Sequence, residues 1–166
     1  MMKTYKQITL ALAVTAALAG CRPESVKDFV PVESGNVKSI AGTWTGTTVL
    51  QRDNDAERKN FPYKSMDITS ALDFTKVKLT LAESNGQPTT FTIDHGTAPR
   101  ILKFTSGTWK VDNADKVGTI SLINPGDTIK MILGSYNLIS QNKMTLRQSK
   151  TLLGKDAITY EFNFSK

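Results

Sequence analysis

The chain has 166 residues, of which 21 are lysine or arginine and 15 are aspartate or glutamate. A net charge of +6, spread along the chain rather than clustered, gives no basic patch of the kind that binds nucleic acid. Cys21 is the only cysteine, which excludes an intramolecular disulfide.

Residues 1–20 have the features of an export signal. Lys3 and Lys6 come before an apolar run from Ile8 to Leu18, and small residues then lead to Cys21. The run is too short to span a membrane as a helix of the mature protein. We therefore predict a signal peptide over residues 1–20.

The stretch after the signal has no sustained hydrophobic period. It contains Pro23, Pro31 and Gly35 together with several charges, which is typical of a flexible coil. We predict a tether over residues 21–38 and a folded domain over residues 39–166, a length that suits a single domain.

From residue 39 onward, hydrophobic residues alternate with polar ones, which is the period of half-buried β-strands. The clearest example is the last segment, where Ile158, Tyr160, Phe162 and Phe164 alternate with polar residues. Strands are predicted at residues 39–50, 76–81, 90–94, 101–104, 108–111, 117–123, 128–133, 143–148 and 158–165.

Turn-forming residues lie between these strands. Asn85-Gly86 favours a type I′ hairpin, because both central positions of that turn need a positive φ. Residues 124–127, Asn-Pro-Gly-Asp, favour a tight turn. Further turns are predicted at 106–107, 113–116, 134–135 and 153–156. Strands and turns at this spacing indicate an all-β sandwich or barrel.

One connection breaks the pattern. Residues 51–73 are long and charged, and Asp67 is placed to cap one or two helical turns in which Ile68, Ala71 and Leu72 face inward. The sequence thus predicts an all-β fold with one short helix in its first long loop.

Gly42-Thr43-Trp44 on the first predicted strand resembles the Gly-x-Trp signature of lipocalins. The resemblance covers residues 39–166 in strand order. It implies an antiparallel up-and-down β-barrel of about eight strands, closed at one end around Trp44. It also implies a basic residue lying across that tryptophan, Arg147 or Lys150, and a lid formed by residues 51–73. The second lipocalin motif, Thr-Asp-Tyr, is absent, so the resemblance implies no ligand class.

Leu18-Ala19-Gly20-Cys21 resembles the lipobox of bacterial lipoproteins, in which the cysteine carries acyl chains. Two or more such chains hold a protein on a membrane durably, because each buried methylene contributes about 0.8 kcal/mol. Together, the lipobox, tether and barrel are similar to lipocalin-like lipoproteins of Gram-negative bacteria. The resemblance therefore implies lipidation of Cys21 and a place in the cell envelope, at the outer membrane.

His95 is the only histidine, and it follows Asp94. A catalytic triad needs a nucleophile, a base and an orienting group in one place, whereas neighbouring residues on a strand face opposite sides. The sequence places no such set together. We therefore predict that the protein is not an enzyme.

Asp53, Asp55 and Glu57 are spaced like the start of a calcium-binding loop. The glycine and the glutamate that such a loop needs at its sixth and twelfth positions are replaced by Arg58 and Lys64. We predict neither a metal nor a cofactor.

Two expectations about function follow. In the first, the anchored barrel binds a small apolar or amphipathic ligand beneath the lid. The residues expected to bind it are Phe61, Tyr63, Trp109 and Met131, and those expected at the closed end are Gly42, Trp44 and Arg147. In the second, the barrel is packed and the protein is a non-catalytic accessory module of an envelope or glycan-uptake complex. The space inside the barrel distinguishes the two.

Overall fold

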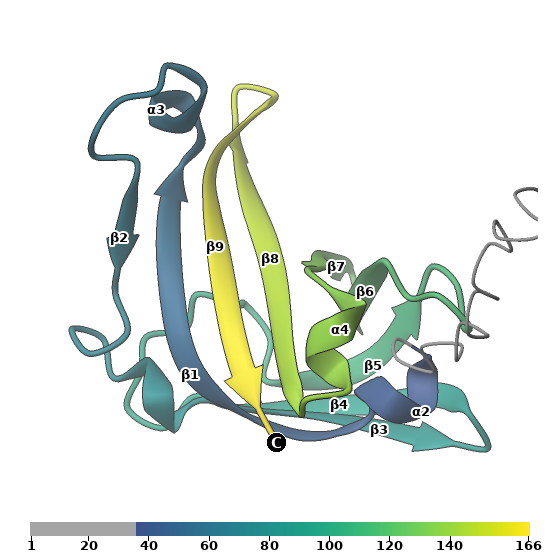
Figure 1. The fold of residues 1–166 in the computed structure, drawn as a ribbon. Coiled ribbons are helices and arrows are strands. Elements are labelled where there is room, and N and C mark those ends of the chain that lie inside the picture. The colour runs from purple at the N-terminus through teal and green to yellow at the C-terminus, as the bar shows by residue number, and fades with distance from the viewer. Residues whose placement is uncertain (1–35) are drawn as a thin grey trace, which may run out of the picture. The chain divides into compact units, whose positions relative to one another are not determined.

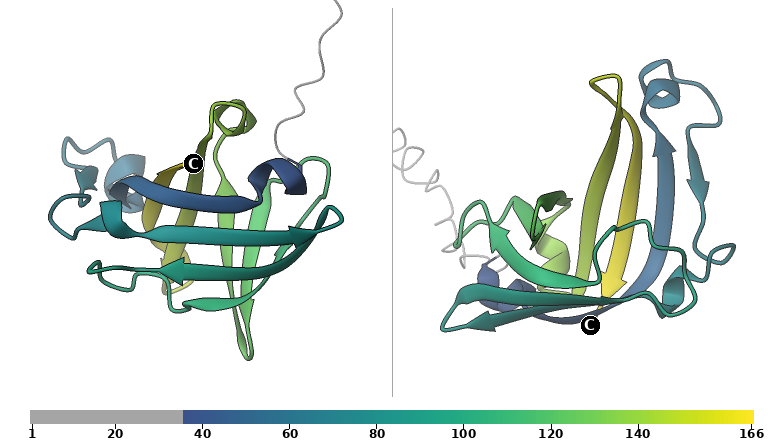
Figure 2. Two further views of the ribbon diagram at one scale, coloured as in Figure 1. Left: turned by 90° about the horizontal axis from the view of Figure 1, so that it is seen from below. Right: turned by 180° about the vertical axis from the view of Figure 1, so that it is seen from behind.

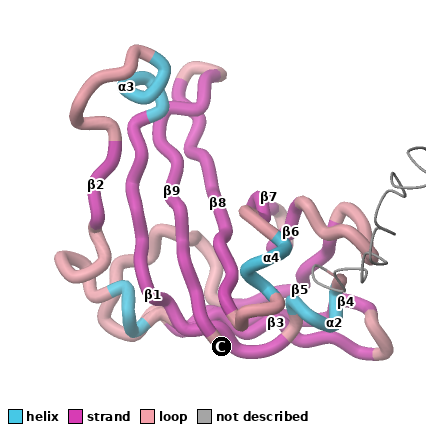
Figure 3. Tube along the Cα trace, in the orientation of Figure 1, coloured by secondary structure: helices cyan, strands magenta, loops and turns pink. Residues whose placement is uncertain are grey.

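A computed structural model describes residues 36–166 of the chain. The predicted signal peptide, Cys21 and nearly all of the predicted tether lie outside the described residues. The described part consists mostly of β-strands, with a few short helices (Figure 3).

Eight antiparallel strands close into a barrel (Figure 1). Each barrel strand pairs with the next along the chain, and β1 also pairs with β9, which closes the ring. The barrel strands are β1 (Gly42–Asp53), β3 (Lys78–Ser84), β4 (Gln87–Asp94), β5 (Ser106–Val111), β6 (Thr119–Asn124), β7 (Asp127–Leu133), β8 (Lys143–Leu152) and β9 (Lys155–Ser165). A short additional strand, β2 (Ser65–Asp67), pairs with the second half of β1. The predicted lipocalin-like, up-and-down barrel is confirmed.

Three long strands extend the barrel on one side. β1, β8 and β9 have 12, 10 and 11 residues and stand steeply against β3 and β4 (Figure 2). β1 pairs with β3 through residues 42–45 and with β2 through residues 50–52, and a bulge against β9 lies between these regions. Gly46 stands at the bulge, where an added Cβ would lie 2.5 Å from the carbonyl oxygen of Phe74. The absence of a side chain therefore permits this close approach.

Large side chains fill the interior of the barrel. The largest fully buried ones are Trp44, Trp109, Phe74, Phe91, Ile40, Leu79, Leu81, Ile120, Leu122, Met131, Met144 and Leu146. Along β3, β4 and β7 they alternate with more exposed residues, because successive side chains of a strand point to opposite faces. This alternation is the one that the sequence predicts.

Three segments cover the ends of the barrel. At the end where β1 begins, helix α2 (Val37–Ile40) buries Val37 and Ile40 in the core. At the opposite end, the β4–β5 connection buries Ala98 and Leu102, and the 3-10 helix η1 (Phe74–Lys76) buries Phe74. We call residues 95–105, the β4–β5 connection, the plug.

Several predicted boundaries are wrong: residue 76 belongs to η1, and residues 117 and 118 precede β6. Three other differences are larger. Residues 39 and 40 belong to α2 rather than to the first strand, because the Asn36 side chain caps this helix by accepting a hydrogen bond from the Ser39 amide. Residues 101–104 are not a strand but part of the plug. Ser106 and Gly107, predicted as a turn, begin β5.

The first long loop contains a short helix, but not where it was predicted. Helix α3 (Asn54–Arg58) begins after Asp53, whose side chain accepts hydrogen bonds from the amides of Asp55 and Ala56. Asp67 instead accepts from the Thr69 amide at the end of β2, and the following residues form turns. The better-capped start therefore lies at Asp53.

The predicted hairpin turn at residues 85–86 is confirmed. Asn85 and Gly86 have φ values of 53° and 76°, as a type I′ turn requires. Leu153 and Gly154, between β8 and β9, have φ values of 50° and 76° and turn the chain in the same way. The first turn joins β3 to β4, and the second joins β8 and β9 into a long hairpin.

Candidate functional site

The four residues predicted to bind a ligand do not form one site. Trp109 and Met131 are buried in the core. Phe61 and Tyr63 lie in the loop after α3, with 52% and 92% of their surfaces exposed. The structure therefore does not bring the four side chains together.

The barrel interior has little free space. A cavity of about 10 Å³ lies between the plug and the core and is lined by Phe74, Val77, Leu79, Ile93, His95, Pro99, Ile101, Leu102, Phe162 and Phe164. This volume is about that of one water molecule. Among the described residues, the core and the plug together fill the interior of the barrel.

The Trp44 indole marks the end of the barrel that α2 covers. Its Nε1 donates a hydrogen bond to the Ile40 carbonyl at 2.7 Å. The Lys166 ammonium lies 4.5 Å from the ring centroid and donates to the carbonyls of Ser39 and Ala41. Gly42 leaves room for it, since an added Cβ would lie 3.1 Å from the Lys166 Cε.

The residue across Trp44 is therefore Lys166, and the assignment of Arg147 or Lys150 to that place is wrong. β8 starts beside the last residues of β9 and runs away from Trp44, so Arg147 lies further along it. The Arg147 side chain points out of the barrel toward Glu161. Lys150 donates to the Ile101 carbonyl in the plug.

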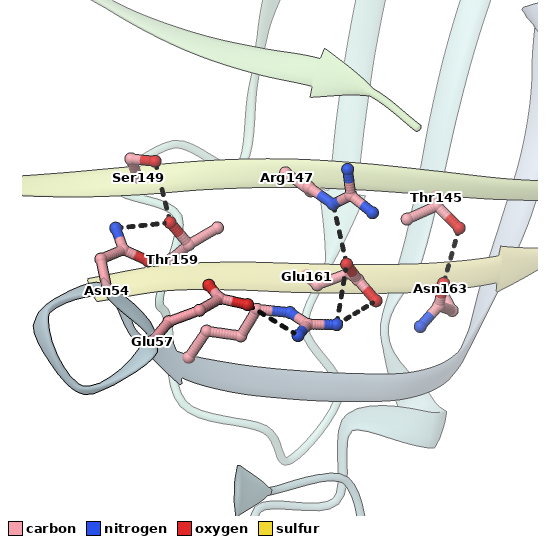
Figure 4. Close-up of polar contacts among 9 residues, drawn as sticks. Asn54, Glu57, Thr145, Arg147, Ser149, Thr159, Glu161 and Asn163 are labelled. Carbon is pink, nitrogen blue, oxygen red and sulfur yellow. Dashed lines mark hydrogen bonds and ion pairs between the residues drawn. The ribbon is translucent and has the colours of Figure 1, made fainter. Parts of the chain in front are cut away.

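A polar cluster lies on the outer face of β1, β9 and β8 (Figure 4). Glu161 of β9 is 7% exposed. Its carboxylate accepts a hydrogen bond from Arg147 Nε at 2.7 Å and contacts Arg52 Nη2 at 3.4 Å. Arg52 Nη1 lies 3.8 Å from Glu57 of α3. Four alternating charges therefore run across three strands and onto α3.

Two arginines determine the charge state of Glu161. Burial raises the pKa of its carboxyl, but the hydrogen bonds and positive charges of Arg147 and Arg52 outweigh this, so the pKa lies below its ordinary value of 4.5. Glu161 is therefore ionised at neutral pH and holds both guanidinium groups in place.

Replacing Glu161 with glutamine should lower the free energy of unfolding by about 1–3 kcal/mol at neutral pH, since two guanidinium groups lose their counter-charge. Because the folded pKa is lowered, the carboxylate stabilises the fold fully above the unfolded pKa of 4.5, and this contribution is lost as the pH falls through the folded value. Urea unfolding across this range should show the difference between wild type and variant shrinking in acid.

Glu57→Gln is the matched control for Glu161→Gln. The Glu57 side chain is 48% exposed and lies at the far end of the same row of charges. An exposed pair of this kind contributes at most about 1 kcal/mol. A difference between wild type and Glu161→Gln that stayed constant with pH would contradict the assigned role of the Glu161 carboxylate.

A groove lies over this cluster. It measures about 380 Å³ and is lined by Arg52, Asn54, Glu57, Ile132, Arg147, Ser149, Thr159 and Glu161. We call it the outer groove. A second hollow, of about 340 Å³, lies next along β8 and β9 and is lined by Thr47, Thr48, Leu138, Lys143, Met144, Thr145, Asn163, Phe164 and Ser165. We call it the lower hollow.

The Arg147 side chain in the outer groove has N–H donors that form no hydrogen bond within the described residues. Only its Nε binds Glu161; within residues 36–166, its two terminal nitrogens have no protein partner. Its side chain is 46% exposed, and the exposed Ile132 lies opposite it on β7. A fixed guanidinium with free donors is suited to a carboxylate or another planar anion.

The other candidate side chains have structural partners. Asp55 pairs with Arg58 and Lys59, which lowers the pKa of the Asp55 carboxyl. Asp94 accepts from the Gly96 amide. His95 is the exception: burial lowers the pKa of its imidazole, and within the described residues its buried Nε2 has no hydrogen-bond partner. Among the described residues, no three metal-ligating side chains come together, and no helix is long and apolar enough to cross a membrane.

Comparison with known proteins gives no family for this chain. No family model matches it, and no curated protein matches it. The features that bear on function are therefore those of the structure itself: a filled barrel, an exposed groove and an oriented arginine.

Proposed function

We propose that this protein is a non-catalytic interaction module, anchored to the membrane through Cys21, that binds its partner on the outer face of β1, β9 and β8. The filled barrel interior is the observation that carries this proposal. The barrel serves as a rigid support, and the outer groove, with Arg147 at its centre, serves as the binding surface.

The first expectation, an apolar ligand inside the barrel, has less support. Pockets for small ligands measure roughly 300–1,000 Å³, whereas the interior cavity measures about 10 Å³. A ligand would have to displace the plug, and with it the buried side chains of Ala98 and Leu102. The outer groove is open without such a change.

The location of binding can be tested by nuclear magnetic resonance. Adding a soluble envelope extract of the native bacterium to the isotopically labelled protein should shift amide signals of Arg147, Ser149 and Glu161. The amide signals of core residues such as Leu79 and Ile120 should not shift, because these residues are buried in the packed interior. Shifts centred on the core and the plug would overturn the proposal in favour of an interior ligand.

Replacing Cys21 with serine should release the protein from the membrane fraction, because serine is not lipidated at a lipobox. Immunoblots of separated membrane and soluble fractions measure this. Ser25→Ala is the control, since it alters the predicted tether and leaves the cysteine in place. If the Cys21→Ser protein stayed on membranes that had been washed with high salt, the anchor would lie elsewhere.

A further inference from the structure

The polar side chains of the outer face form three rows along β8 and β9 (Figure 4). In the first row, Thr159 accepts from Asn54 and bonds to Ser149. The second is the row of Arg147 and Glu161. In the third, Thr145 donates to Asn163. A strand rises about 3.4 Å per residue, so neighbouring rows lie about 7 Å apart and the three span about 14 Å.

These rows connect the outer groove with the lower hollow. Ser149, Thr159, Arg147 and Glu161 line the outer groove, and Thr145 and Asn163 line the lower hollow. Helix α3 lies at one end, and helix α4 (Tyr136–Ile139), in the β7–β8 connection, lies beside β8 toward the other end (Figure 1). The surface therefore has room for an elongated ligand rather than a compact one.

The backbone of this surface is already paired. β9 is hydrogen-bonded to β1 along one edge and to β8 along the other. A peptide that adds itself as a strand needs a free edge, and one that binds as a helix needs an apolar groove. Here the ligand meets hydroxyl, amide, carboxylate and guanidinium groups, together with the apolar side chains of Ile132 in the outer groove and of Leu138, Met144 and Phe164 in the lower hollow. This chemistry fits a chain of hydroxyl groups better than a peptide.

The charges favour an acidic ligand. Arg52, Arg147 and Lys143 outnumber Glu57 and Glu161 among the lining residues. Both acids face Arg52 or Arg147, and Glu161 itself fixes the direction of the Arg147 guanidinium. The free donors of Arg147 are therefore the strongest unused binding group on this face.

We propose that the outer groove and the lower hollow together bind an acidic oligosaccharide, with a uronate carboxylate on the terminal nitrogens of Arg147. Sugar hydroxyls bind the rows on either side: Ser149 with Thr159 in one, and in the other the amide of Asn163, which the buried Thr145 holds in place. Ile132 supports the apolar face of the ring next to Arg147. This inference rests on the proposed function and adds the class of ligand.

Isothermal titration calorimetry with a galacturonate oligomer tests the proposal. Arg147→Gln should weaken binding about 10- to 100-fold, since a charge-assisted hydrogen bond to a carboxylate is lost. Arg147→Lys, which keeps the charge but not the planar fork, should bind with intermediate affinity. The control is Lys110→Gln, which removes one positive charge from the exposed face of β5 and should bind like wild type.

Three comparisons make the result decisive. The fully methyl-esterified oligomer has the same sugars without the carboxylates and should bind at least about 10-fold more weakly to wild type. Thermal melts should show that Arg147→Lys is folded. A polyglutamate peptide that bound as tightly, and depended on Arg147, would overturn the ligand class while the interaction-module proposal stood. If wild type and both Arg147 variants bound galacturonate with equal affinity, the inference would be overturned. Shifts of the core amide signals in the nuclear magnetic resonance experiment would instead overturn the proposed function.

Discussion

Replacing Trp44 with alanine should lower the free energy of unfolding by about 3–5 kcal/mol. The Trp44 side chain is completely buried, and its removal leaves a large cavity at the end of the barrel that α2 covers. It also leaves the Ile40 carbonyl without its indole donor and the Lys166 ammonium without the ring beneath it. Urea unfolding followed by circular dichroism measures the loss.

Trp44→Phe separates these contributions. Phenylalanine keeps an aromatic ring in the core but cannot donate to the Ile40 carbonyl, so the variant should lose less stability than Trp44→Ala. A loss below about 1 kcal/mol for Trp44→Ala would mean that the ring is not part of a packed core.

Replacing Gly107 with alanine should also destabilise the fold strongly, lowering the free energy of unfolding by about 2–3 kcal/mol. An added Cβ would lie 2.2 Å from the Ile123 carbonyl oxygen and 2.9 Å from a ring carbon of Phe91. The Ile123 carbonyl belongs to the backbone of β6, so it cannot move aside without disturbing the pairing of β5 and β6.

Thr108→Ala is the control for Gly107→Ala. Thr108 is the next residue of β5, and its side chain is exposed. This change should cost no more than about 0.5 kcal/mol. If Gly107→Ala unfolded at the same urea concentration as Thr108→Ala, the close contact between β5 and β6 would not exist.

The sequence predicts the barrel because its main signal is local. A strand with one buried face has a two-residue period. The sequence shows this period directly at Phe91 and Ile93, and again at Ile129 and Met131. The Asn85-Gly86 turn is equally local. Ile101 and Leu102 show the limit of this signal, since a short apolar run has the same composition in a strand and in the plug that covers the barrel end.

The outer groove could not be predicted in the same way, because one bulge decides which residues meet. Near the turn, Leu152 pairs with Lys155 and Thr151 with Asp156. Continuing that register would place Arg147 opposite Tyr160, on the buried side. The bulge between Lys150 and Thr151 moves the pairing by one residue, so Arg147 meets Glu161 instead.

The basic residue that lies across Trp44 was not predicted correctly, for a related reason. A basic residue beside Trp44 was expected, but the sequence does not say from which strand it comes. The pairing of β1 with β9 brings the residues after Phe164 next to Gly42, and Lys166 is the basic residue among them. Pairing the last predicted strand with the first, as a closed barrel requires, points to this residue.

The pairing of β1 with β9 also has a consequence for how the protein folds. The Thr47 hydroxyl donates to the Asn163 carbonyl across 116 residues of sequence, and most of β1 depends on the same distant partner. Contacts of such long sequence separation slow folding, because the loop-closure entropy is lost before they form. Until β9 docks, one edge of β1 is unpaired and exposed to association with other chains. We therefore expect slow folding in which closure of the ring is the late event.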